Sequence, residues 1–142
     1  MKKIETSNFK ILTGTWKTTG TIKTSNETQV LDGYDSYELI LDGNFILHKA
    51  DVRMGNETSE TVELISLDGS VDKARMQYFN SKGETGVMNG KLTNNELEID
   101  GSRIKFRGVI NNECTEITGK WFLQTDNNDW TEFIELKLEK QY

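Results

Sequence analysis

The sequence predicts an all-β fold in which a single up-and-down antiparallel sheet closes into a small barrel. Turn dipeptides such as Asn-Gly and Asp-Gly recur at spacings of roughly 8–12 residues, which is typical of all-β sandwiches and barrels. Between these turns apolar and polar residues alternate, as they do in strands with one buried face. The connections are too short for the crossovers that parallel strands need, and closure removes the exposed edges of a long sheet.

Length and charge define the class of protein before any motif is considered. The chain has 142 residues, no proline and a net charge of −6. This length suits one domain with one sizeable core, so we expect a single domain over residues 1–142. The acidic balance and the lack of any basic run argue against a nucleic-acid partner.

Cysteine usage and the apolar segments indicate the compartment. The single cysteine, Cys114, excludes an internal disulfide and gives no sign of an oxidising compartment. Residues 1–6 include two lysines, but no apolar segment follows them, so we expect no signal peptide. No stretch is long and apolar enough to span a membrane as a helix. We therefore expect a cytoplasmic protein without a membrane partner.

The first element is expected to be a short helix or turn that closes one end of the barrel. Ser7 has the side chain of an N-cap, and Phe9, Ile11 and Leu12 follow it before Gly14. We expect residues 7–12 to place these apolar side chains against the barrel interior.

About nine or ten strands follow in chain order, and residues two apart within each strand share a face. Turn signals separate them, among them Asp32-Gly33, Asp42-Gly43, Asn89-Gly90 and Asn94-Asn95. The sets predicted to face inward are Trp16, Thr18, Gly20 and Ile22; Ile46, His48, Ala50, Val52 and Met54; Leu97 and Ile99; Ile104, Phe106, Gly108 and Ile110; and Ile134, Leu136 and Leu138.

Residues 12–16, Leu-Thr-Gly-Thr-Trp, resemble the opening of lipocalin-like barrels of the calycin superfamily, where Gly-x-Trp begins the first strand. The segments 37–46, 78–83 and 130–138 extend this resemblance over most of the chain, to a group of uncharacterised bacterial calycin-like proteins. The resemblance implies a lipocalin-like barrel with Trp16 closing its base, and it raises the expectation of an internal cavity. The group has no common activity that could be carried over.

The same resemblance bears on cofactors. Related barrels bind lipids, pigments or haem, and a few act as isomerases. Haem-binding relatives use a histidine on a late strand, and residues 130–136 contain none. We therefore expect no haem and no other cofactor.

His48, the only histidine, has inward parity between Ile46 and Ala50. It is either an acid–base group or ligand anchor inside the cavity, or a histidine that is hydrogen-bonded within the core. One histidine and one distant cysteine do not supply the ligands of a zinc site, so no metal is expected.

Glu132 has the parity of Ile134 and would place a carboxylate inside the barrel. A buried carboxylate without a partner would have a raised pKa, which suits proton transfer. The alternative is a β-bulge near Phe133 that leaves Glu132 in water.

Aromatic and sulfur-containing side chains also have inward parity. They either fill the barrel or line a pocket for an apolar ligand that tyrosine hydroxyls orient. Together with His48 and Glu132, the candidate ligand-binding residues are Trp16, Tyr37, Met76, Tyr78 and Trp121.

Three functions are compatible with this sequence. The first is binding of a small, mostly apolar molecule inside the barrel. The second is an isomerase or lyase that uses His48 and Glu132 as an acid–base pair, which requires the two side chains to converge. The third is a homodimer or partner-binding domain with an outer apolar patch. Residues with outward parity for such a patch are Ile40, Leu47, Ile65, Phe79, Phe122 and Phe133.

Overall fold

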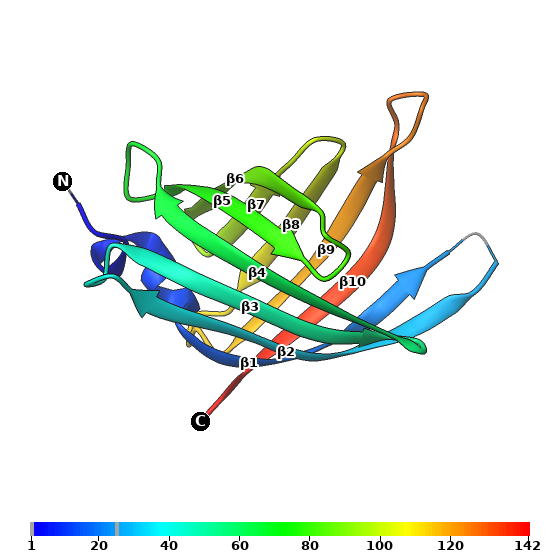
Figure 1. Cartoon of the computed structure of the whole chain (residues 1–142), viewed down its shortest axis with the longest axis horizontal. Coiled ribbons are helices and arrows are strands. Elements are labelled where there is room, and N and C mark those ends of the chain that lie inside the picture. Colours follow the sequence, from blue (N-terminus) through cyan, green and yellow to red (C-terminus); the bar gives the residue numbers. More distant parts are fainter. Residues whose placement is uncertain (1, 25) are drawn as a thin grey trace.

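The computed structural model describes residues 2–24 and 26–142, and these residues form a closed antiparallel barrel of ten strands. Each strand pairs with the next along the chain, and β1 pairs with β10 to close the ring (Figure 1). The predicted all-β, up-and-down barrel is confirmed. Its elements are the 3-10 helices η1 (Ile4–Thr6) and η2 (Asn8–Leu12), followed by β1 (Gly14–Lys23), β2 (Thr28–Ile40), β3 (Phe45–Met54), β4 (Glu57–Leu67), β5 (Lys73–Asn80), β6 (Thr85–Thr93), β7 (Glu96–Asp100), β8 (Ile104–Ile110), β9 (Glu116–Gln124) and β10 (Trp130–Gln141).

The N-terminal segment forms the short helical plug that the sequence predicts. The Ser7 hydroxyl oxygen accepts a hydrogen bond from the Phe9 N–H and caps η2. The Asn8 side-chain amide donates to the carbonyl of Leu92, which ties the plug to β6. Among the described residues, no helix combines the length and the apolar composition that crossing a membrane requires.

The plug and the nearest strand ends form a fully packed core, here called the closed end of the barrel. Phe9, Trp16, Ile46 and Ile65 are each 0% exposed. The Trp16 indole N–H donates to the carbonyl of Leu12 at 2.8 Å, so its one polar group is satisfied inside the core. The expected role of Trp16 at the base of the barrel agrees with this position.

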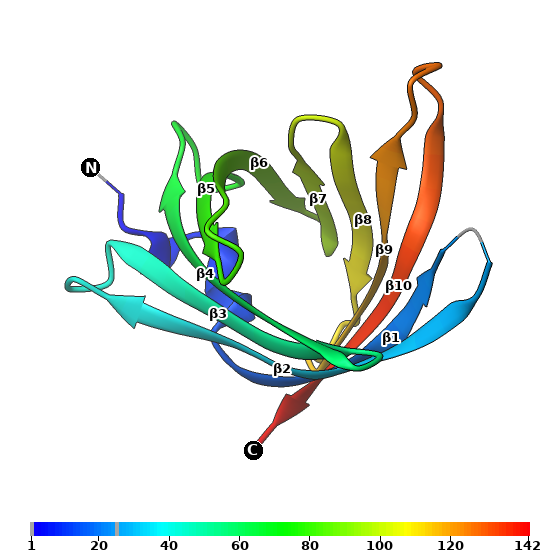
Figure 2. The same ribbon diagram turned by 45° about the vertical axis from the view of Figure 1, so that its right-hand side comes forward.

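Away from the closed end, the barrel interior becomes accessible. Along β3, Ile46 is fully buried, whereas Ala50 and Val52 on the same inner face keep part of their surface exposed. Along β4, Ile65 is fully buried and Thr61 is partly exposed. We call this accessible end the mouth; Figure 2 shows the strands curving around the common interior.

Two of the predicted turn signals lie inside strands instead. Asp32-Gly33 belongs to β2, and Asn89-Gly90 belongs to β6. The glycines serve close approach rather than chain reversal: a Cβ on Gly33 would lie 2.1 Å from the backbone oxygen of Asp51, and one on Gly90 would lie 2.6 Å from the Met76 methyl group. The Asn94-Asn95 signal is a true hairpin turn, with positive φ at both residues.

Candidate ligand-binding site

Four side chains form a continuous row across the inner wall. Tyr37 on β2 is the cross-strand partner of His48 on β3, His48 that of Glu63 on β4, and Glu63 that of Tyr78 on β5. Cross-strand partners point to the same face of a sheet, and their Cβ atoms lie about 5 Å apart. We call Tyr37, His48, Glu63 and Tyr78 the polar row. It lies one step nearer the mouth than the fully packed core.

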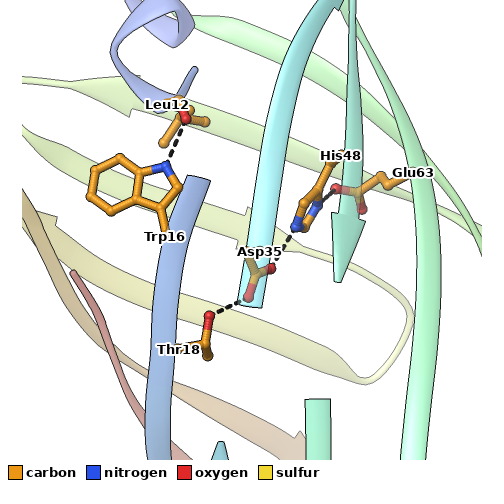
Figure 3. A network of polar contacts seen from close by, with 6 residues as sticks. All are labelled: Leu12, Trp16, Thr18, Asp35, His48 and Glu63. Atoms are coloured by element: carbon orange, nitrogen blue, oxygen red, sulfur yellow. Dashed lines mark hydrogen bonds and ion pairs between the residues drawn. The ribbon is translucent and has the colours of Figure 1, made fainter. Parts of the chain in front are cut away.

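A hydrogen-bond network holds the centre of the polar row in place (Figure 3). The His48 Nε2 atom lies 2.6 Å from Oδ2 of Asp35, and its Nδ1 atom lies 2.9 Å from Oε1 of Glu63. The Thr18 hydroxyl donates to the other oxygen of Asp35. The Tyr37 ring stacks on the imidazole with 4.0 Å between ring centroids and 7° between planes. Five side chains from β1 to β4 thus form one connected cluster.

The two carboxylates determine the charge of His48. Burial alone would lower the pKa of His48, but the hydrogen bonds and charges of Asp35 and Glu63 outweigh it and raise the pKa from 6.5 to about 9. The imidazole is therefore protonated at neutral pH and donates from both nitrogens. Burial and the same two carboxylates raise the pKa of Tyr37 well above its usual value, so its hydroxyl keeps its proton.

This arrangement predicts an unusual titration for the only histidine. NMR of the imidazole nitrogens is expected to give a midpoint near pH 9 rather than near 6.5. Because the folded-state pKa is raised, the stabilisation from His48 is complete below pH 6.5 and is lost as the pH rises through 9. The free energy of unfolding, measured in urea, should fall across this window. A midpoint at or below 6.5 would contradict the doubly bonded imidazolium.

Several polar atoms on the inner wall keep unused hydrogen-bonding capacity. Within the described residues no side-chain nitrogen or oxygen that is closed off from solvent lacks a partner. The hydrogen bonds of Glu63 engage only Oε1, and none engages the hydroxyls of Tyr37 and Tyr78 or the indole N–H of Trp121. These four groups therefore remain in contact with solvent, although Glu63 as a residue is only 6% exposed.

An apolar wall lies across the interior from the polar row. The strand order places β8 and β9 opposite β3 and β4 in the ring. Phe106 on β8 and Trp121 on β9 are cross-strand partners, and their ring centroids lie 5.2 Å apart. Ile99 and Ile134 extend this wall on either side. The interior therefore has one polar and one aromatic and aliphatic side.

The structure separates the predicted ligand-binding residues into two levels. Trp16 and Met76 belong to the closed end, where they are 0% and 2% exposed. Tyr37, Tyr78 and Trp121 lie on the inner wall and are partly exposed, as is His48. Only this second group borders the accessible part of the interior.

Glu132 lies on the outer face, so its predicted inward orientation is wrong and the alternative of a β-bulge near Phe133 is confirmed. A β-bulge between Glu132 and Ile134 pairs Glu132 with outward-facing Phe122. Its carboxylate lies 2.9 Å from Nζ of Lys23 and 3.1 Å from Nζ of Lys120, and these two lysines lower the pKa of Glu132. The acid–base pair of His48 and Glu132 is therefore excluded by the fold.

Sequence reasoning missed the two carboxylates that matter most here. Asp35 lies two residues before Tyr37 and shares its inward parity, so the alternation in β2 contains the signal that identifies it. Glu63 was missed because the alternation in β4 was assigned to the wrong faces, with its inward residues taken as outward. Ile65, predicted to face outward, pairs with Ile46 and is fully buried, and Glu63 shares its face.

The outer wall carries part of the predicted apolar patch. Phe79 is 44% exposed, and its cross-strand partner Val62 is 40% exposed. Leu64, 39% exposed, is the cross-strand partner of half-buried Leu47. A homodimer through this face stays a prediction.

No protein-family model matches the sequence, and no curated protein sequence matches it either. Solved structures match the fold. The chain is similar to Rv2717c from M. tuberculosis, with 10% sequence identity, a TM-score of 0.69, and coverage of 95% of this chain and 98% of the other. It is also similar to the S-type phycobiliprotein lyase CPES from Guillardia theta, with 10% identity, a TM-score of 0.67, and coverage of 94% and 90%. These likenesses support a lipocalin-like barrel at the level of the fold.

Proposed function

We propose that this protein binds a small, mostly apolar molecule in the mouth half of its barrel. The observation that carries the proposal is the polar row, which lies where the interior changes from fully packed to accessible. Ligand sites in proteins are mostly apolar concavities with a few precisely placed polar groups. The polar row opposite the partly exposed side chains of Ile99, Trp121 and Ile134 has this composition.

The open hydrogen-bonding groups support binding rather than simple packing. A barrel that only needs a filled core has no use for a buried imidazolium between two carboxylates, because apolar residues of similar volume would be at least as stable. Here the hydroxyls of Tyr37 and Tyr78 and the Trp121 N–H lie on the inner wall, and none has a hydrogen-bond partner in the part of the chain that the structure describes. They provide orientation for a ligand whose apolar part contacts the opposite wall.

The comparisons contribute only the barrel shape to this proposal. One neighbour is named as a lyase, but at 10% identity its chemistry does not transfer. The acid–base pair considered for an enzyme is absent from the interior because Glu132 lies outside. We therefore propose binding without a chemical step.

A neutral fluorescent probe tests the proposal. N-phenyl-1-naphthylamine should bind saturably to the wild-type protein with increased fluorescence. Tryptophan in place of Ala50 should reduce this binding at least tenfold, because Ala50 faces inward one step above the polar row, between Asp35 and Thr61. The matched control is Lys49→Trp, which introduces the same side chain one residue away on the outer face.

The two variants separate interior binding from adsorption to the surface. Circular dichroism first shows that both are folded, and Thr61→Trp replaces Ala50→Trp if that variant does not fold. Equal binding by the inner and outer tryptophan variants would overturn the proposal. So would a wild-type protein that leaves the probe unbound at millimolar concentrations.

A further inference from the structure

The cluster at the centre of the polar row has an unbalanced charge. It contains two acidic side chains, Asp35 and Glu63, and one basic side chain, His48, so its formal charge at pH 7 with a protonated imidazole is −1. Among the described residues, His48 is the only basic side chain within ion-pair distance of either carboxylate. The cluster therefore presents one net negative charge to the interior.

Hydrogen bonding leaves one strong acceptor open. Both nitrogens of His48 and both oxygens of Asp35 are occupied by partners within the cluster. On Glu63, Oε1 accepts from His48, and Oε2 has no partner among residues 2–24 and 26–142 yet keeps contact with solvent. Glu63 as a residue is only 6% exposed, and an unused carboxylate oxygen in such a residue is a site for a donor or a cation, not for an anion.

We infer that the interior selects apolar amines: a protonated amino group donates to Oε2 of Glu63 while the apolar body lies against Trp121 and Ile134, which are partly exposed. This inference rests on the proposed function and adds the chemical class of the ligand. The ammonium charge balances the cluster, whereas a fatty acid would bring a second unpaired negative charge into it.

Three ligands that share one alkyl chain test this selectivity. Octylamine, octanol and octanoate compete with N-phenyl-1-naphthylamine at neutral pH and moderate salt. Octylamine is expected to bind at least tenfold more tightly than octanol, because a charge-assisted hydrogen bond replaces a neutral one. Octanoate is expected to bind more weakly than octanol. Equal affinities for the amine and the alcohol, or tighter binding of octanoate, would overturn the inference.

Two variants with the same change in net charge show whether the preference for octylamine over octanol comes from Glu63. Glu63→Gln removes the interior charge and should reduce the preference for octylamine over octanol to less than threefold. Glu132→Gln removes one negative charge from the outer face and should leave the preference unchanged. If both variants lose it equally, the preference comes from the overall acidity of the protein and the inference is wrong.

The design also separates this inference from the proposal on which it rests. If the probe binds and octanol displaces it but octylamine has no advantage, the barrel binds ligands and only the amine class is wrong. If neither the probe nor any of the three ligands binds wild-type protein, the proposed function itself is wrong. The wild-type comparison needs no variant, so it stands even if Glu63→Gln does not fold.

Discussion

Replacing His48 with leucine is expected to lower the free energy of unfolding by about 3–5 kcal/mol. The side chains of Asp35 and Glu63 are only 12% and 8% exposed, and His48 is the one cation that pairs with them among the described residues. Removing one member of a buried ionic cluster leaves the remaining charges desolvated and unpaired. Urea unfolding at neutral pH, followed by circular dichroism, measures the loss.

Two controls show whether the loss comes from charge. Lys49→Leu makes a similar substitution one residue away on the outer face and should change stability by less than about 0.5 kcal/mol. The triple variant Asp35→Asn, His48→Leu, Glu63→Gln removes both carboxylate charges and should recover most of the stability. A His48→Leu protein within about 1 kcal/mol of wild type would show that the carboxylates do not depend on the imidazolium.

Trp16→Ala is expected to destabilise the protein by about 3–5 kcal/mol, because it removes a large, fully buried side chain from the closed end. The substitution also leaves the carbonyl of Leu12 without the indole N–H that now donates to it at 2.8 Å. Thermal and urea unfolding measure the effect. Trp16→Phe, which keeps an aromatic ring but loses this donor, should give an intermediate loss.

Trp130 provides the comparison for Trp16. It lies on the outer face, 39% exposed, with Nζ of Lys105 4.2 Å from its ring centroid. Trp130→Ala should cost no more than about 1 kcal/mol, since an exposed cation–π contact contributes little. Equal losses for Trp16→Ala and Trp130→Ala would mean that the plug and Trp16 do not form the packed base of the barrel.

Much of the fold could be predicted because strand parity and turn chemistry are local properties of the sequence. The inner faces of β1, β3 and β8 follow directly from alternation around Trp16, His48 and Phe106. The hairpin turn at Asn94-Asn95 follows from the tolerance of asparagine for positive φ. Gly33 and Gly90 were misread because a glycine that permits close packing looks the same in sequence as one in a turn.

The site was less predictable because it depends on pairing between strands. The β-bulge after Glu132 exchanges the inner and outer faces at the start of β10. Phe133 indicated a bulge as one alternative, but alternation alone does not decide between a regular strand and a bulged one. The wrong phase for β4 concealed Glu63, and without Glu63 and Asp35 the environment of His48 could not be inferred. Register between strands distant in sequence is set by the closed barrel as a whole, so a strand taken alone does not specify it.

The central claim is that a ligand enters the barrel and reaches the polar row, and the single histidine reports on this directly. Octylamine titrated into the wild-type protein should shift the imidazole resonances of His48 saturably, and the Ala50→Trp variant should show no such shift. Binding of octylamine, detected by displacement of N-phenyl-1-naphthylamine, with His48 resonances that do not move would place the ligand elsewhere and contradict the account.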